Sequence, residues 1–203
     1  MIIVKFIGLL IFAYLLGSIP WGLILARIFG GIDIRRKGSG NIGATNVMRE
    51  VVVMPGLLTL AGDVFKGALP VYMARWAFGA ADGAGDIYPA AVALAAFLGH
   101  CFPVYLKFRD GGKGVATAAG CFAVISLTAV SAVFGLFALM LLVSRRVSLG
   151  SLCAAAALPV SIWIAAGSHV LIVAAAIIAL LIFVRHHANI KRLLARDEPA
   201  FKL

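Results

Sequence analysis

The sequence predicts an all-α integral membrane protein with seven transmembrane helices, some of them short, in a single polytopic domain of residues 1–203. Of its 203 residues, 63% are hydrophobic and only 13% are charged, and the mean hydropathy is +1.08. Soluble domains average roughly 45–50% apolar residues and about 25% charged ones. A spanning helix takes about 20 apolar residues, so the chain has room for about six to eight spans and for no separate soluble domain.

The charge balance is strongly basic, because 18 Lys and Arg stand against 8 Asp and Glu and give a formal net charge of +10. A charge in hydrocarbon costs about 2.5–3.5 kcal/mol on insertion scales, so most of these residues belong to loops. Basic loops attract anions such as lipid headgroups and phosphorylated small molecules. The lack of repeats that combine basic and aromatic residues argues against a nucleic-acid partner. The three cysteines lie in apolar stretches, which argues against a disulfide framework or a metal site.

The first expected span covers residues 2–28 and is interrupted by Gly17-Ser18-Ile19-Pro20. No convincing small-residue cleavage site follows, which favours a retained span over a signal peptide. Residues 27–49 form the longest polar stretch and carry five basic residues. The positive-inside rule places this stretch in the cytoplasm and the N-terminus outside.

The second span, residues 51–80, leads to an acidic turn at 81–86 that is expected outside. The third, residues 88–106, returns to a cytoplasmic basic loop. Residues 115–144 are uncharged and end at Arg145-Arg146, which a single crossing would put outside. We expect two short helices of about 15 residues, roughly 22 Å each against a core of ~30 Å, because thinning the bilayer costs less than reversing the charge rule.

The last two spans are expected at residues 149–166 and 168–184, so that the basic tail and the C-terminus are cytoplasmic. In this topology 15 of the 18 Lys and Arg lie on or near one face, all except Lys5, Lys66 and Arg75. The functional site is therefore expected on the cytoplasmic face.

Residues 38–49, with the sequence GSGNIGATNVMR, look like a phosphate-binding loop. Three glycines allow backbone N–H groups to converge on one anion, and Ser39, Asn41, Thr45 and Asn46 add side-chain donors. The segment matches neither a Walker A loop nor a dinucleotide fingerprint. The alternative is an ordinary turn with a helix cap, but such a turn does not need this many donors beside four basic residues.

A second glycine-rich segment, Gly111-Gly112-Lys113-Gly114, lies on the same expected face and supplies a point charge between flexible residues. A flexible loop that merely follows the positive-inside rule would look similar. Two cationic glycine-rich loops on one face favour a shared anion site.

Three further groups of polar residues are candidates. His186 and Asn189 share a face if the last helix continues, although a helix-end role for the histidine is the alternative. Ser148 and Ser151 fit either a helix cap or a ligand contact. Asp63 and Lys66, three residues apart inside a span, indicate a mutually neutralised pair, and His100 indicates a structural hydrogen-bonding residue.

Missing motifs narrow the chemistry. No group of acids falls within one span, which excludes a magnesium-dependent phosphotransferase built on several aspartates. No His-x4-Asp pair and no G-x-S-x-G elbow occurs. What remains is catalysis by positioning and by stabilisation of charge on phosphoryl groups and oxyanions, with neither metal nor cofactor.

In combination these stretches resemble the PlsY family, the bacterial membrane glycerol-3-phosphate acyltransferases that take their acyl group from acyl phosphate. The matching stretches follow one another over nearly the whole chain, at residues 17–20, 38–49, 63–67, 99–103, 111–117, 148–151 and 186–193.

The resemblance implies a multi-pass enzyme of the bacterial cytoplasmic (inner) membrane with its active site at the cytoplasmic face. It would transfer a fatty acyl group from acyl phosphate to the 1-hydroxyl of glycerol 3-phosphate and release lysophosphatidic acid and phosphate. The residues implied to bind acyl phosphate are Gly38, Ser39, Gly40, Asn41, Gly43, Thr45, Gly112 and Lys113. Those implied to bind glycerol 3-phosphate are Arg49, Lys113, Ser151, His186 and Asn189, and the catalytic set is Ser39, Lys113 and His186.

The residues themselves leave two questions open. The hydroxyl proton goes either to the donor's own phosphate or to His186. A carrier for a phosphorylated anion, or a structural protein whose basic loops only bind anionic lipid, would use the same two loops. Membrane lipid and a transient contact with the enzyme that makes acyl phosphate complete the expected partners.

Overall fold

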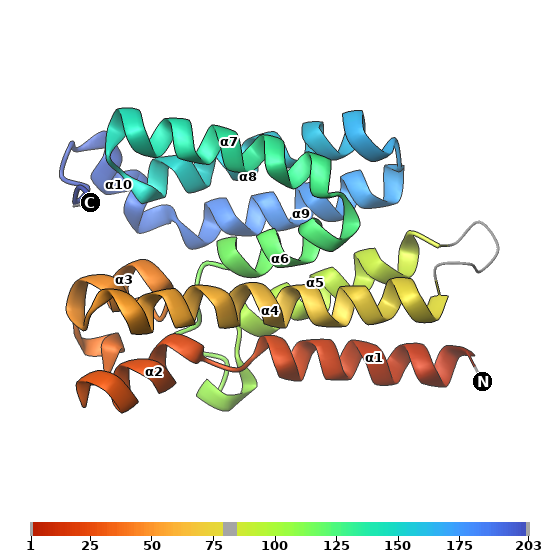
Figure 1. The fold of residues 1–203 in the computed structure, drawn as a ribbon, viewed down its shortest axis with the longest axis horizontal. Coiled ribbons are helices and arrows are strands. Elements are labelled where there is room, and N and C mark those ends of the chain that lie inside the picture. The colour runs from red at the N-terminus through yellow and green to blue at the C-terminus, as the bar shows by residue number, and fades with distance from the viewer. Residues whose placement is uncertain (1, 79–84, 202–203) are drawn as a thin grey trace. The chain divides into compact units, whose positions relative to one another are not determined.

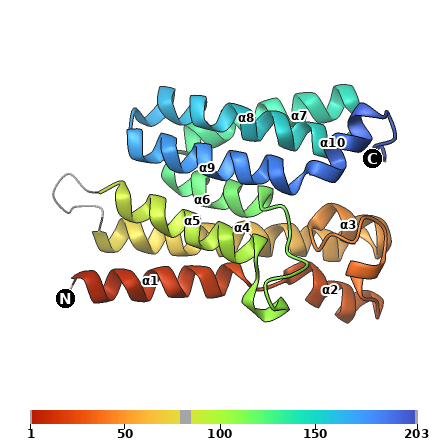
Figure 2. The ribbon, with the colours of Figure 1, turned by 180° about the vertical axis from the view of Figure 1, so that it is seen from behind.

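The computed structural model describes residues 2–78 and 85–201, and their regular structure is entirely helical (Figures 1 and 2). The chain divides into two compact units, with the boundary between Val124 and Ile125. The acidic turn expected at residues 81–86 falls mostly outside the described residues.

Five helical segments in the described ranges are long and apolar enough to cross a membrane: Ile2–Gly30, Val53–Phe78, Ile87–Leu106, Leu127–Ser144 and Val147–Ala166. A sixth is the bent pair His169–Arg185 and His187–Leu194. Val115–Ile125 is apolar but has only 11 residues, about 16 Å of helix, which is much less than the ~30 Å core. The all-helical, multi-span prediction is confirmed, and this short helix corresponds to the first of the two short spans expected at 115–144.

The first span is broken where the sequence indicated. Helix α1 (Ile2–Gly17) ends at the Gly-Ser-Ile-Pro segment, and α2 (Trp21–Gly30) begins after Pro20. The Ser18 hydroxyl donates to the Tyr14 carbonyl at 2.8 Å, which satisfies one of the carbonyls at the end of α1. Proline has no N–H to donate to a continued helix, so the chain restarts as a separate helix.

Helix α1 packs against α4 (Val53–Phe78) and α5 (Ile87–Cys101) in the first unit. Two glycines permit the closest approach between α1 and α5. A Cβ on Gly17 would lie 2.2 Å from the Ala96 carbonyl oxygen, and a Cβ on Gly99 would lie 2.2 Å from the Tyr14 carbonyl oxygen. Small residues at such crossings let helix backbones pack closely in membranes.

The polar stretch between α2 and α4 contains more helix than expected. It holds a 3-10 turn, η1 (Ile34–Arg36), and α3 (Ala44–Glu50), so the second half of the expected loop at 38–49 is a helix. A small apolar core attaches the stretch to α2, formed by Leu23, Ala26, Ile34, Ile42 and Val47. The buried Ile34 and Ile42 therefore anchor the segment from Gly38 to Gly40 on both sides.

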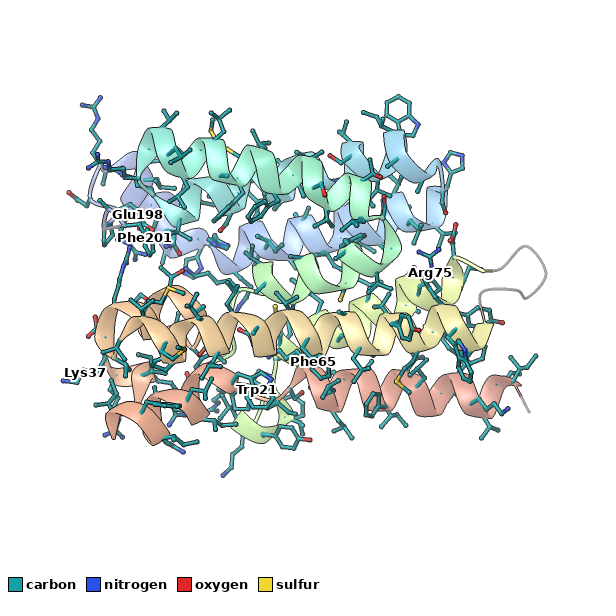
Figure 3. The ribbon with its side chains drawn as sticks, viewed as in Figure 1. Trp21, Lys37, Phe65, Arg75, Glu198 and Phe201 are labelled. Carbon is teal, nitrogen blue, oxygen red and sulfur yellow. The ribbon has the colours of Figure 1, made fainter. Side chains whose placement is uncertain are left out.

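The expected pair of equal helices at 115–144 is corrected by the structure. Helix α6 (Val115–Ile125) is short and α7 (Leu127–Ser144) is long, because the break falls at Ser126. The Ser126 hydroxyl accepts a hydrogen bond from the Ala129 N–H at 3.2 Å and caps α7. At the end of α6, the Arg75 side chain from α4 donates to the Val124 carbonyl at 2.7 Å (Figure 3).

The second unit consists of α7 followed by α8 (Val147–Ala166), α9 (His169–Arg185) and α10 (His187–Leu194). Helix α8 packs against both α7 and α9, as Figures 1 and 2 show. The chain end folds back, because the Phe201 N–H donates to the Arg145 carbonyl at 2.6 Å. Figure 3 labels Phe201 and Glu198 on this returning segment.

Candidate active site

The first glycine-rich loop is organised by one buried amide, that of Asn46 in α3. Its Oδ1 accepts a hydrogen bond from the Ser39 N–H at 3.0 Å, while its Nδ2 donates to the carbonyls of Lys37 at 3.1 Å and Asn41 at 2.9 Å. A third carbonyl, that of Ile34, lies 3.4 Å away. Asn46 therefore supports the loop from beneath, a different task from the anion contact expected of it.

The backbone of this loop also differs from the expected nest. Gly38 and Gly40 have positive φ of 54° and 70°, as the motif requires. However, four N–H groups have partners inside the stretch: Ser39 donates to Asn46, Gly40 to Lys37, Asn41 to the Ser39 hydroxyl and Gly43 to the Asn41 side chain. The convergence of these four N–H groups on an anion is thus not what the structure shows. The side chains of Ser39, which is exposed, and of Asn41 and Thr45, which are half-buried, remain candidate anion donors.

The second loop is held tightly and is not the flexible segment that its glycines suggested. Residues 111–114 lie directly against the last turns of α5. A Cβ on Gly111 would be 2.1 Å from the Cys101 carbonyl oxygen, one on Gly112 would be 1.9 Å from His100 Nε2, and one on Gly114 would be 2.2 Å from the Phe97 ring. The Gly112 N–H also donates to the His100 carbonyl at 3.1 Å. Lys113 is therefore carried on a fixed backbone and is itself half-buried.

An ion-pair chain connects the approaches to the two loops. Arg35 binds Asp33 through two side-chain hydrogen bonds, Nε to Oδ1 at 2.9 Å and Nη2 to Oδ2 at 2.6 Å, and its Nη1 lies 3.3 Å from Asp110 Oδ2. The hydrogen bond from the Arg35 side chain outweighs partial burial and holds the pKa of Asp33 well below its usual value. Arg35 therefore joins the residue preceding Gly111 to the turn that leads into Gly38.

The expected pair of Asp63 and Lys66 is confirmed inside α4. Lys66 Nζ lies 2.8 Å from Asp63 Oδ1, and both side chains are buried. The pair is part of a larger network, because Lys66 also donates to the Ile19 carbonyl at 2.8 Å and His100 Nδ1 lies 3.6 Å from Asp63 Oδ1.

In the second unit, the candidate histidine occupies a helix bend. His186 lies between Arg185, the last residue of α9, and His187, the first residue of α10, and the two helices are bent by 62°, so the straight continuation expected through Asn189 is corrected. His186 Nδ1 lies 2.8 Å from the Ile182 carbonyl oxygen, and the side chain is 2% exposed. Because a carbonyl oxygen only accepts, Nδ1 is the donor in this contact, and when the ring is neutral its lone pair is on Nε2.

The orientation of Asn189 is fixed by a residue that the sequence reasoning missed, Glu198. Asn189 Nδ2 donates to Glu198 Oε1 at 2.7 Å, and Arg192 Nε donates to Glu198 Oε2 at 2.7 Å. A carboxylate only accepts, so the amide nitrogen of Asn189 must face Glu198 and its Oδ1 must point elsewhere. The signal available in the sequence was a pair of adjacent acids, Asp197 and Glu198, in an otherwise basic tail.

Glu198 is 8% exposed, and its surroundings set its charge. Burial alone would raise its pKa, but the donors of Ser148, Asn189 and Arg192 outweigh burial and hold the pKa below its usual value. In α8, the Ser151 hydroxyl donates to the Val147 carbonyl at 2.9 Å. Because its hydrogen is used in this bond, the Ser151 oxygen can act toward a ligand only as an acceptor. Ser151 and Ser148 are both within α8 and do not cap it.

The polar groups of each unit suit a phosphorylated ligand. The first unit combines basic side chains, hydroxyls and amides around two loops. The second unit provides a buried imidazole, an oriented amide and a serine oxygen, which can accept hydrogen bonds from hydroxyl groups. No described residue among these is a carboxylate positioned as a base; Glu198 is engaged by Asn189 and Arg192.

Comparison with known proteins agrees with this chemistry. Residues 7–196 match the family model described as glycerol-3-phosphate acyltransferase. The chain is 50% identical over 198 residues to the glycerol-3-phosphate acyltransferase of Syntrophotalea carbinolica, with 98% of each chain covered. It is 46% identical over 190 residues to that of Geobacter sulfurreducens, with 94% of each chain covered.

Two solved structures of PlsY, an integral membrane glycerol 3-phosphate acyltransferase, are also similar to the chain at 37% identity. The glycerol 3-phosphate form matches with a TM-score of 0.91 and the lysophosphatidic acid form with 0.88. Each match covers 98% of this chain and 96% of the other.

Proposed function

We propose, from the premise that this chain belongs to the glycerol-3-phosphate acyltransferase family and is an integral membrane acyltransferase, that its acyl donor is an acyl phosphate. The acceptor is the 1-hydroxyl of glycerol 3-phosphate, and the products are lysophosphatidic acid and inorganic phosphate. The observation that carries the proposal is the close packing of the backbone on both sides of Lys113, from which one ammonium group is presented. Such a point charge suits a phosphoryl group that leaves as an anion.

The donor's phosphate is assigned to the first unit. Ser39, Asn41 and Thr45 provide side-chain donors, the glycines at 38, 40 and 43 shape the loop, and Lys113 with Gly112 approaches from the second loop. Support comes from the Arg35 ion pairs, which tie the flanks of both loops together. A phosphate bound by several side-chain donors gains charge-assisted hydrogen bonds, the stronger class in proteins.

Glycerol 3-phosphate is assigned to two kinds of side chain, basic residues for its phosphate and hydrogen-bond acceptors for its hydroxyl groups. Arg49 and Lys113 bind its phosphate. Ser151, His186 and Asn189 bind its glycerol hydroxyls, because the Ser151 oxygen, the His186 Nε2 and the Asn189 Oδ1 are acceptors when their donors are used as described above. This division of roles accounts for a site that needs both positive charge and neutral acceptors.

The reaction needs no covalent enzyme intermediate, because an acyl phosphate is already an activated mixed anhydride. The 1-hydroxyl oxygen forms a bond to the acyl carbonyl carbon, and the bond from that carbon to the phosphate oxygen breaks. Lys113 stabilises the negative charge that develops on the phosphate, and the catalytic set is Ser39, Lys113 and His186. The hydroxyl proton passes to an oxygen of the departing phosphate, so that the donor supplies its own base, and His186 is the alternative acceptor.

The proposed topology has seven crossings, an outside N-terminus and a cytoplasmic C-terminus in the bacterial inner membrane. Helix α6 is then a short crossing over which the bilayer thins. The arrangement puts both glycine-rich loops and the His186 bend on the cytoplasmic side, where soluble substrates and the enzyme that makes acyl phosphate have access. Single cysteines at Leu127 and Arg145 test it: an impermeant thiol reagent added outside should label position 127 and not 145.

The defining experiment supplies the purified protein with labelled glycerol 3-phosphate and one of three additions: palmitoyl phosphate, palmitoyl-CoA or no donor. Labelled lysophosphatidic acid and released phosphate from palmitoyl phosphate alone are expected. Product only from the CoA ester would contradict the donor assignment. Uptake of labelled glycerol 3-phosphate into sealed vesicles without covalent product would favour the carrier.

A further inference from the structure

Three buried ionisable side chains in the first unit have no role in the chemistry described so far. Asp63, Lys66 and His100 are 3%, 1% and 4% exposed. An ionisable residue within a membrane span is costly, and it is retained mostly where it pairs or serves a function. The close ion pair between Asp63 and Lys66 would be sufficient for neutralisation, so the approach of His100 to the same carboxylate oxygen requires a separate explanation.

The network of Asp63, Lys66 and His100 is held in place at the Lys66 end. Lys66 bridges Asp63 in α4 and the carbonyl of Ile19, in the break between α1 and α2. Asp63 therefore cannot turn away without breaking a buried ion pair and leaving a buried charge without its partner. Its carboxylate forms a stationary negative group beside α5.

His100 connects that stationary group to the second glycine-rich loop. One side of the ring has Nδ1 at 3.6 Å from Asp63 Oδ1, a distance at which the carboxylate orients the ring by charge. The other side has Nε2 so close to Gly112 that a Cβ there would overlap it at 1.9 Å. The ring is thus packed between Asp63 and the backbone of the residue that precedes Lys113.

We infer that His100, oriented by Asp63, is a positioning residue for Lys113. The imidazole forms the surface on which Gly112 rests, and this surface sets the height and direction from which the Lys113 side chain leaves the backbone. The inference rests on the proposed function, in which the Lys113 ammonium faces the phosphoryl group. Gly111 and Gly114 contribute by lying flush on Cys101 and Phe97, so the segment has supports on both sides of the lysine.

Removal of the His100 ring should therefore slow the reaction, and it should do so only when Lys113 is present. Without the ring, Gly112 can sink toward α5 and the ammonium shifts. A misplacement of about 1 Å in a catalytic group can reduce the rate by about 10²-fold. His100→Ala should therefore lower kcat/KM by about 10- to 100-fold while the protein still folds.

A double-mutant cycle tests the inference in purified protein. The rates of wild type, His100→Ala, Lys113→Ala and the double variant are compared with one donor. If His100 acts through Lys113, the loss from His100→Ala should shrink to less than about 2-fold in the Lys113→Ala background. An equal loss in both backgrounds, or no loss in either, overturns the inference.

Two conservative variants keep the test decisive if His100→Ala fails to fold. The end of a glutamine side chain reaches the place of the ring Nε2, whereas an asparagine reaches only the place of Nδ1. His100→Gln should keep kcat/KM within about 5-fold of wild type and His100→Asn should lose about 10-fold or more, again only when Lys113 is present. Equal rates for the two variants, or losses that follow Tm irrespective of Lys113, would leave His100 a purely structural residue.

The same assay tests the proposed acyl donor separately from the role of His100. Product formed by the wild type from acyl phosphate tests the donor assignment alone. The cycle compares variants with whichever donor the wild type accepts, so its result on His100 stands even if that donor proves to be a CoA ester.

Discussion

The side-chain oxygen of Asn46 lies 3.0 Å from the backbone nitrogen of Ser39 and holds a residue of the proposed catalytic set in place. The same amide donates to carbonyls from both sides of that residue, at Lys37 and Asn41. One buried side chain thus closes a loop whose glycines would otherwise leave it many conformations.

Asn46→Ala should lower both Tm and kcat/KM, because it leaves the Lys37 and Asn41 carbonyls without their donor, at about 1–3 kcal/mol for each buried group. Asn46→Asp is the matched variant: it keeps an oxygen for the Ser39 N–H but cannot donate to the carbonyls. We expect kcat/KM to fall by about 10-fold or more in both, because the loss of loop order misplaces the phosphate donors. An Asn46→Ala protein with wild-type Tm and rate would contradict this account.

The two aspartates that contact Arg35 should differ in their contributions to stability. Asp33 binds Arg35 through two side-chain hydrogen bonds and also accepts the Arg35 N–H at 3.1 Å, whereas Asp110 makes one contact and is 56% exposed. Asp110→Asn should cost less than about 1 kcal/mol, an effect that disappears in high salt. Asp33→Asn should cost about 1.5–3 kcal/mol, because charge-assisted bonds are lost at a less exposed site. Denaturant titrations of both variants at two salt concentrations measure the difference, and equal costs would refute it.

The sequence was sufficient for the main helices, the break at residues 17–20 and the pairing of Asp63 with Lys66, because each depends on apolar runs, proline geometry or an i,i+3 spacing. It also contained an overlooked signal for the break between α6 and α7, since Ser126 directly precedes an apolar run and is a preferred N-cap residue. Hydropathy alone favoured two equal helices, but the cap decided the boundary.

Other features could not be read from the sequence, because they depend on contacts between distant residues. The use of loop N–H groups by Asn46 and Asn41 depends on how α3 folds back on the loop. The close fit of Gly112 on His100 requires α5 and the loop to be side by side. The burial of Glu198 requires the tail to return across α10, and no local pattern in the tail indicates this return.

Stability should depend on the ionisation of Glu198. Its pKa is lowered in the folded protein, so the folded state gains from the charged form at pH values above the unfolded pKa, and this gain is lost as pH falls through the folded pKa. Wild-type Tm should therefore drop below about pH 4.5, the unfolded value for glutamate, more steeply than the Tm of Glu198→Gln. The glutamine keeps an acceptor for Asn189 but loses the charge facing Arg192, so its Tm should be lower at pH 7. Identical pH profiles of Tm for the two proteins would show that Glu198 contributes no charge-dependent stability.

The fate of the hydroxyl proton can be decided at His186. If the donor's phosphate takes the proton, His186 only binds glycerol 3-phosphate. His186→Ala should then raise KM for glycerol 3-phosphate while kcat at saturation stays within about 10-fold of wild type. If His186 is the base, kcat should fall by about 10²- to 10⁴-fold with KM unchanged, because general-base catalysis contributes that much. The exposed neighbour His187, replaced by alanine, is the matched control for loss of an imidazole at the same bend.

The pH profile separates the two mechanisms independently of rate. Nδ1 of His186 is committed to the Ile182 carbonyl, so only Nε2 can accept a proton, and protonation of the ring at low pH would remove this base. A base at His186 therefore predicts that kcat falls on the acid side in wild type and that this acid limb disappears in His186→Ala. Substrate assistance predicts an acid limb set by the ionisation of the acyl phosphate, present in both proteins. Because the ring lies at a bend between two helices and is almost fully buried, the two outcomes should be compared at temperatures well below the Tm of the variant.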